Sequence, residues 1–171
     1  RTELCAVLPR VFRTADEQPL RAILERHPEV TSVTVGNWGH MPIVRGLGKT
    51  LRGDLGLNVY NSRAVAFWRE RGLTSVTASL ELRWQQVRDL GKYADCEAVI
   101  YGRLPLMITE NCVTKSSVGC AHGAGSVLTD RTGAQFPVLC AYGCRSELQN
   151  GKTLWLADKP EWKRCGLTYA R

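Results

Sequence analysis

Four cysteines in the last third of the chain have the residue type and spacing of metal ligands. They lie in "NCVTKSSVGC" and "CAYGC", and gaps of seven, nineteen and three residues separate them. Four thiolates from two neighbouring loops can form a tetrahedral shell for zinc or hold an iron–sulfur cluster. The alternative is that some of them are small buried side chains, above all the cysteine that ends the apolar run "FPVLC". The candidate ligands are Cys112, Cys120, Cys140 and Cys144.

The cysteine count also bears on the compartment and on nucleophilic chemistry. The chain has seven cysteines, an odd number, and shows no signal-peptide pattern, so we expect reduced thiols and a cytoplasmic location. A nucleophilic cysteine needs a nearby base or cation that lowers its pKa. His122 is the only histidine in the cysteine-bearing part, and no triad order surrounds it. A metal site, which His122 could join, is therefore favoured over a catalytic thiol.

Composition and charge bound the class of protein. The chain has 171 residues, of which 44% are apolar, enough for one domain with a core. It has no apolar run long enough to span a membrane, and its first residue, an arginine, suggests a processed product or a piece of a longer protein. The net charge of +7 favours a polyanionic partner such as RNA, although solvated arginines on helices are common. The arginines on two consecutive helical segments are Arg63, Arg69, Arg71, Arg83 and Arg88.

Strand-like and helix-like segments alternate through the first 107 residues. The strand-like runs are "LCAVLPRV", "SVTVGN", "LRGDLGLNVY", "SVTASL" and "CEAVIYGRLPLM", and the helix-like segments cover residues 17–27, 41–47, 62–71 and 82–94. This alternation predicts βαβ units with a parallel sheet. About four such units plus a fifth strand predict an α/β fold, either a partial TIM-like (β/α) barrel or an open doubly wound sheet.

The amino-acid composition changes after Met107. Residues 108–171 are small, polar and glycine-bearing, and "SVLTDRTGAQFPVL" predicts a hairpin that turns at Asp130 and Gly133. We therefore expect a partial barrel over residues 1–107 and a small β-rich, cysteine-containing region over residues 108–171.

Polar residues at the ends of the predicted strands are candidates for binding a polar or anionic ligand. In "DLGLNVYN", read as a strand, the leucines and the valine share one face, whereas Asp54, Gly56, Asn58 and Tyr60 share the other. Catalytic and binding groups of (β/α) barrels gather at such strand ends. The alternative is that residues such as Asn37, Asn61 and Ser79 cap the following helices. The candidates are Asn37, His40, Asp54, Asn58, Asn61, Glu81 and Arg103.

Several of these segments resemble a known family. "LRGDLGLNVYNS", "TASLEL", "YGRLPLMITENC" and "LTDRTGAQFPV" are similar to the C-terminal part of peptidase family U32, the collagenase-like peptidases of unknown catalytic type. The resemblance runs from about Leu4 to Leu156. It implies a peptidase, hence a hydrolase, with a TIM-like barrel whose earlier strands lie in an N-terminal portion. The sequence departs from the family's cysteine signature, which ends in a closely spaced "GxCxQxCR", and the nearest match is "CAYGCRSEL". The resemblance therefore leaves two alternatives: the four cysteines bind the metal, or the cluster belongs to the absent N-terminal portion and these four hold zinc or nothing.

The resemblance leaves several functions open. Other family members are implicated in RNA modification, the prephenate-dependent hydroxylation of ribosomal or transfer RNA, and in ubiquinone hydroxylation, both with cysteine-bound iron–sulfur clusters. A peptidase needs a nucleophile with a base or a metal-activated water, and the sequence has no HExxH and no recognisable Ser–His–Asp or Cys–His set. The catalytic set is therefore incomplete in this segment. A third possibility is a non-catalytic half-barrel that associates with itself or with the N-terminal portion and completes its active site.

Overall fold

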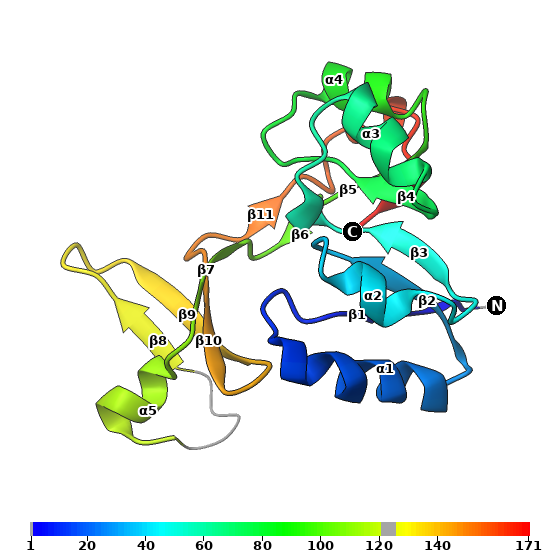
Figure 1. The fold of residues 1–171 in the computed structure, drawn as a ribbon. Helices are drawn as coiled ribbons and strands as arrows, with labels where there is room; N and C mark the ends of the chain where they lie inside the picture. Colours follow the sequence, from blue (N-terminus) through cyan, green and yellow to red (C-terminus); the bar gives the residue numbers. More distant parts are fainter. Residues whose placement is uncertain (1, 121–125) are drawn as a thin grey trace. The chain divides into compact units, whose positions relative to one another are not determined.

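The computed structural model describes residues 2–120 and 126–171, and Figure 1 shows its elements. The chain forms two compact units. Unit 1 is described over residues 2–100 and 158–171, and unit 2 comprises residues 101–157. A helix that crosses a membrane needs about 20 apolar residues, and none of the helices within the described ranges combines such a length with such a composition.

Unit 1 is built on a curled sheet of six parallel strands in the order β1-β2-β3-β4-β5-β12. The α/β class and the parallel sheet that the sequence predicts are confirmed. The strands are β1 (Leu4–Val7), β2 (Val30–Val35), β3 (Thr50–Gly53), β4 (Leu73–Thr77), β5 (Asp95–Ala98) and β12 (Tyr169–Ala170). The helices between the first five strands are α1 (Glu17–Arg26), α2 (His40–Val44), α3 (Ser62–Arg69) and α4 (Trp84–Leu90).

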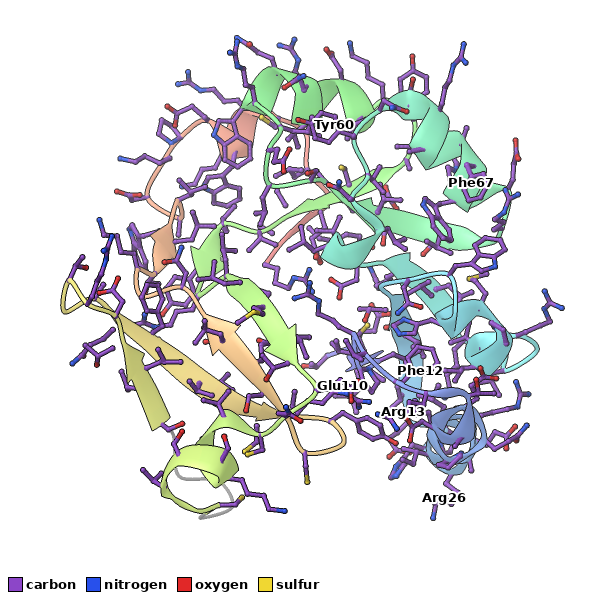
Figure 2. All side chains as sticks on the ribbon, turned by 60° about the vertical axis from the view of Figure 1, so that its left-hand side comes forward. Phe12, Arg13, Arg26, Tyr60, Phe67 and Glu110 are labelled. Carbon is purple, nitrogen blue, oxygen red and sulfur yellow. The ribbon has the colours of Figure 1, made fainter. Side chains whose placement is uncertain are left out.

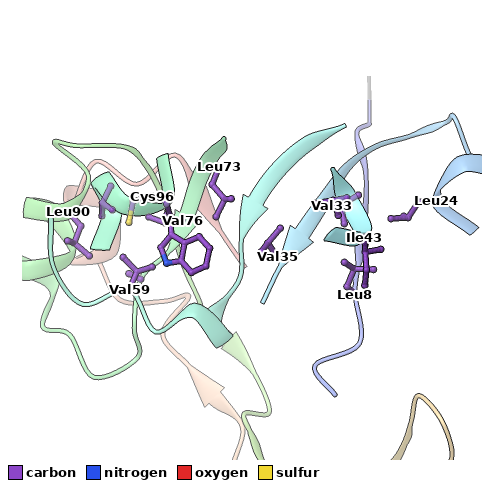
Figure 3. Packing of buried hydrophobic residues seen from close by; sticks show 14 of the residues in the cluster. Leu8, Leu24, Val33, Val35, Ile43, Val59, Leu73, Val76, Leu90 and Cys96 are labelled. Carbon is purple, nitrogen blue, oxygen red and sulfur yellow. The ribbon is translucent and has the colours of Figure 1, made fainter. Parts of the chain in front are cut away.

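The hydrophobic core of unit 1 lies between the sheet and these helices (Figure 3). Val33 and Val35 alternate with hydroxyl residues along β2, so the valines face the helices and the hydroxyls face the opposite side of the sheet. α3 starts where the sequence predicts, because the Asn61 side chain accepts a hydrogen bond of 3.0 Å from the Ala64 backbone N–H. The core residues that Figure 3 labels on strands and helices include Leu24, Ile43, Val76, Leu90 and Cys96.

The expected strand "LRGDLGLNVY" is wrong beyond Gly53. The Asp54 carboxylate accepts a hydrogen bond from the Leu55 N–H, and Leu55–Leu57 form a short 3-10 helix, η2, that ends at Asn58 in the left-handed region, with φ 46°. A Cβ at Gly56 would collide with the carbonyl oxygen of Gly36, so only glycine fits this close approach. The two-faced alternation predicted for Asp54 and Asn58 therefore does not exist.

The run "CEAVIYGRLPLM" forms three strands rather than one. β5 belongs to unit 1, whereas β6 (Tyr101–Gly102) and β7 (Pro105–Thr109) belong to unit 2. The last residues return to unit 1, where β12 pairs with β5 after the short helix η3 (Trp162–Arg164). The structural division therefore falls after Ile100 and again before Asp158, whereas the sequence places a single boundary after Met107.

Unit 2 is an antiparallel sheet of four strands in the order β7-β10-β9-β8. The predicted hairpin is confirmed: the Asp130 carboxylate accepts hydrogen bonds from the N–H groups of Thr132 and Ala134, and Gly133 has φ 84°. β11 (Leu154–Trp155) pairs with β6 in a second, two-stranded sheet. The remaining elements are α5 (Val113–Val118), β8 (Ser126–Thr129), β9 (Gln135–Ala141) and β10 (Arg145–Gln149).

Candidate functional site

The inner face of the unit 1 sheet, opposite the face that packs against the helices, carries an open hollow of about 260 Å³. Strand register places its side chains in two rows. Thr34, Arg52 and Ser75 are paired across β2, β3 and β4, and a second row runs across β4, β5 and β12. The members of that second row are Thr77, Glu97 and Tyr169. Most of the side chains that line the hollow are therefore polar or charged, with Cys5 and Val7 of β1 beside them, whereas branched apolar layers fill an ordinary barrel core.

Arg52 joins three separate parts of unit 1. Its Nη2 lies 2.7 Å from Oε2 of Glu3, before β1, and its guanidinium lies 4.4 Å from the ring centroid of Tyr169, on β12. Burial acts to lower the pKa of Arg52, but its hydrogen bonds with Glu3 and Tyr169 outweigh that effect and raise the pKa. Arg52 is therefore a permanent cation within the hollow.

Arg171, just after β12, supplies the second cation. Its Nη2 lies 2.6 Å from Oδ1 of Asp54 and its Nε 3.1 Å from Oε1 of Glu97. Burial acts to lower the pKa of Arg171, and the hydrogen bond and charge of Asp54 together with the charge of Glu97 raise it. The two carboxylates hold this guanidinium at the rim of the hollow.

Two threonine hydroxyls differ in how they are satisfied. Thr77 Oγ1 lies 2.8 Å from the Gly53 carbonyl oxygen and 3.0 Å from Oε1 of Glu97, and its one proton serves one of them at a time. Thr34 lines the hollow and is 8% exposed, and its Oγ1 has no hydrogen-bond partner among the described residues. A buried hydroxyl without a partner costs about 1–3 kcal/mol, so an ordered water or a bound group that hydrogen-bonds Thr34 Oγ1 would be stabilising.

His40 lies outside this hollow and has a structural role. It is 1% exposed, its Nδ1 accepts a hydrogen bond of 2.9 Å from the Gly36 N–H, and its Nε2 lies 3.0 Å from the Pro9 carbonyl oxygen. The ring centroid of Phe12 lies 5.2 Å from that of His40, and Figure 2 labels Phe12 on the segment before α1. Burial lowers the pKa of His40. A neutral imidazole that accepts at Nδ1 and donates at Nε2 satisfies both contacts and fixes the two loops.

Of the other predicted ligand-binding residues, Asn37 lies beside His40, with its Nδ2 3.3 Å from the imidazole Nε2, and the rest have separate positions. The Asn37 amide donates to the Arg10 carbonyl oxygen, and Glu81 accepts a long hydrogen bond of 3.4 Å from the Tyr60 hydroxyl. Arg103 lies in unit 2 and donates to backbone carbonyls of the turn at residues 150–151. Asn58 ends η2 and Asn61 caps α3. Of the seven candidates, Asp54 alone contacts the charged network of the inner face.

Sequence reasoning missed Thr34, Arg52 and Glu97. The signal was present, because "VTSVTV" alternates hydroxyl and apolar residues and "DCEA" places one carboxylate between two apolar side chains. Arg171 gave no such signal. It follows β12, which contains only two residues and lies far along the chain from its partner strand β5.

The predicted metal ligands all lie in unit 2, and the structure brings two of them together. The Cys112 side chain caps α5: its Sγ accepts a hydrogen bond of 3.4 Å from the Lys115 backbone N–H. Its pKa is lowered, first by the Lys115 N–H and also by hydrogen bonds with the side chains of Ser146 and Cys120. A thiolate is the form that binds metals, and the lowered pKa favours that form at Cys112.

A complete shell is not formed by the described residues. Cys140 and Cys144 are both exposed, so the alternative that Cys140 is a buried side chain is wrong. Cys144 has φ 59° in the turn between β9 and β10. Within residues 2–120 and 126–171, no three His, Cys, Asp or Glu side chains are grouped so that they could hold a metal ion, and His122 lies outside the described residues. The four-cysteine site therefore stays a prediction.

The fold and the inner face define an α/β protein with a curled parallel sheet and a polar site on that face. The family model for Peptidase family U32 matches residues 9–150, most of the chain, so the chain belongs to this family. No curated protein and no solved structure matches it.

Proposed function

We propose that unit 1 is part of a TIM-like (β/α) barrel and that its inner face binds the substrate of a collagenase-like peptidase. The observation that carries this proposal is the buried hydroxyl of Thr34, unpartnered among the described residues, which faces a hollow lined by Arg52, Glu97 and Arg171. Barrel enzymes bind their ligands at strand residues and loops of this kind.

The mixed charges of the hollow favour a peptide over a simple anion. Both guanidiniums already have carboxylate partners, Glu3 for Arg52 and Asp54 with Glu97 for Arg171. A ligand that enters must therefore offer acceptors to the arginines and donors to the carboxylates it displaces. A peptide backbone carries both in every residue.

The chain's own residues supply binding rather than a full set of catalytic groups. Among the described residues no serine or cysteine is hydrogen-bonded to a histidine, since His27 pairs with Glu29 and His40 with backbone groups. Arg52 and Arg171 can orient carbonyl oxygens, and Glu97 can accept a peptide N–H. We infer that the group that attacks the scissile bond comes from another portion of the protein.

Thr34→Val tests this proposal. Valine has nearly the shape of threonine, so folding is retained and only the hydroxyl is lost. We expect binding of gelatin-derived peptides, measured by calorimetry, to weaken by about fivefold to tenfold, the value of one hydrogen bond. Thr31→Val, at an exposed position of the same strand, is the matched control. If Thr34→Val and Thr31→Val bind the peptides equally well, the inner face is not the substrate site. Hydrolysis of gelatin or casein by the same proteins is assayed in parallel.

A non-catalytic half-barrel is the second candidate function. β1 and β12 each pair with one neighbour only in the described part of the chain, so both edges of the parallel sheet carry free backbone groups. Strands from an N-terminal portion or from a second copy would satisfy them. Light scattering tests pairing with a second copy, because a monodisperse monomer at all concentrations contradicts self-association.

A third candidate is the iron–sulfur-dependent hydroxylation of RNA bases. The contact between Cys112 and Cys120, with the lowered pKa of Cys112, favours it. The cluster would supply the redox chemistry, and these two thiols would be among its ligands. The test is an ultraviolet–visible spectrum with iron, sulfide and zinc analysis on protein purified without oxygen. Zinc without iron would favour a structural zinc site, and the absence of both iron and zinc would contradict a metal site. RNA retention that falls with salt would support a phosphate contact.

A further inference from the structure

Unit 1 has a second hollow, of about 380 Å³, between the first turn of α4 and η3. Arg83, just before α4, and three residues of α4 line one side, and three residues of the returning segment line the other; these are Trp84, Gln85 and Arg88, and Glu161, Arg164 and Cys165. Residues 161–165 lie beyond the range that the family model matches, which ends at residue 150. This hollow shares no lining residue with the one on the inner face, and three of its seven lining residues belong to a segment that the family model does not match.

The walls of this hollow are held in place from the core side. Cys165 is 6% exposed, and its Sγ lies 3.3 Å from the Trp84 carbonyl oxygen and 3.2 Å from that of Glu161. Burial raises the pKa of Cys165, which keeps it a thiol that donates to one of these carbonyls at a time. Trp84 also packs against the hydrophobic core. The two segments that form the hollow are thus fixed to each other before any ligand binds.

The charges around this hollow are not balanced. Three arginines line it together with one acidic residue, Glu161. Arg83 and Arg164 form no ion pair with any residue that the structure describes, and Arg88 lies 3.9 Å from Asp89, which pairs more closely with Lys92 at 2.7 Å. This contrasts with Arg52 and Arg171 on the inner face, both of which have close carboxylate partners.

We propose that this hollow binds a small phosphorylated molecule carrying about two negative charges, with its phosphoryl oxygens on Arg83, Arg88 and Arg164. Guanidinium groups bind phosphoryl oxygens through paired N–H donors. A doubly charged phosphoryl group offsets the excess of two positive charges, counted as three arginines against Glu161. The apolar wall formed by Trp84 suits the carbon part of such a molecule.

Titration with inorganic pyrophosphate at constant ionic strength tests this site. We expect saturable binding by calorimetry, and we expect Arg164→Gln and Arg83→Gln each to raise the Kd about tenfold. Arg63→Gln is the matched control, because it removes the same charge from an exposed position on α3. It should change the Kd by less than about twofold. All three arginines are exposed, so the variants should fold, and circular dichroism verifies this.

The indole N–H resonance of Trp84 places the bound anion. We assign it by its loss in Trp84→Phe, and expect it to shift during the pyrophosphate titration. The proposal is overturned if binding does not saturate, if the resonance does not move, or if Arg63→Gln weakens binding as much as Arg164→Gln. Thr34→Val should leave pyrophosphate binding unchanged, so failure at this site is distinguishable from failure of the inner-face proposal.

Discussion

His40 shows how burial sets the role of a single titratable residue. The sequence places it after a strand end, where it is a candidate for ligand binding. The structure instead uses both ring nitrogens, with the Gly36 N–H on one side and the Pro9 carbonyl oxygen on the other. A cationic ring would carry a proton on Nδ1 and lose the hydrogen bond from Gly36. His40 therefore fixes loops as a neutral side chain.

This role predicts a pH dependence of stability. Burial lowers the pKa of His40 below its ordinary value of 6.5, so the unfolded chain binds the proton more readily than the folded one. The free energy of unfolding is highest above the unfolded pKa and falls as the pH drops through 6.5 toward the folded pKa. The slope reaches at most about 1.4 kcal/mol per pH unit. Urea unfolding at about pH 7.5 and about pH 5.5 measures it.

Two variants isolate this effect. His40→Gln should remove most of the pH dependence between neutral and mildly acidic solution, whereas His27→Gln, which removes an exposed imidazole, should keep it. A pH dependence that survives His40→Gln would show that another group is responsible.

At the scale of elements, the sequence predicts regular segments well and local departures poorly. The positions of α1 and α3 are correct because apolar spacing acts within a few residues, and at α3 the Asn61 cap adds to it. The strand predicted through Asp54 to Tyr60 fails because η2 depends on the capping carboxylate of Asp54 and on the approach of Gly56 to Gly36. That approach joins two segments that are distant in sequence, so periodicity carries no sign of it.

Gly56→Ala tests the close approach. The added Cβ would collide with the Gly36 carbonyl oxygen, and a clash with backbone is relieved only by moving β2 or η2. We expect a loss of about 1–3 kcal/mol in the free energy of unfolding, measured by urea denaturation. Gly91→Ala is the control, because its Cβ would meet its nearest atom at an ordinary 3.4 Å. A Gly56→Ala protein as stable as Gly91→Ala would contradict the steric argument.

At the scale of the whole molecule, contacts that skip strands hold the curled sheet of unit 1. Arg52 on β3 reaches Glu3 before β1 and Tyr169 on β12, and Arg171 reaches Asp54 after β3. Neighbouring strands are about 4.8 Å apart, so β3 and β12, with two strands between them, would lie too far apart in a flat sheet for the guanidinium to cover the tyrosine ring. The inner-face site and the curvature of the sheet thus depend on the same side chains.

Arg171→Met tests whether the returning segment is held by these ion pairs. Methionine keeps the apolar length of the side chain but leaves Asp54 and Glu97 without their cation. We expect β12 to separate from β5 more often, at a cost of about 1–2 kcal/mol for a partly exposed pair. Amide exchange should therefore accelerate at Ile100, whose N–H donates to the Arg171 carbonyl oxygen.

Arg171→Lys and a distant amide serve as controls for this measurement. Lysine keeps the charge but cannot serve Asp54 and Glu97 with separate N–H groups in a fixed fork, so its effect should be intermediate. The Val33 amide, on β2 at the opposite side of the sheet from β12, should keep its exchange rate in both variants, because opening at β12 is local. Equal acceleration at Val33 and Ile100 would mean that Arg171 stabilises unit 1 as a whole. If amide exchange accelerates at neither residue, backbone pairing alone holds β12 against β5. The inner face then forms without the ion pairs of Arg171.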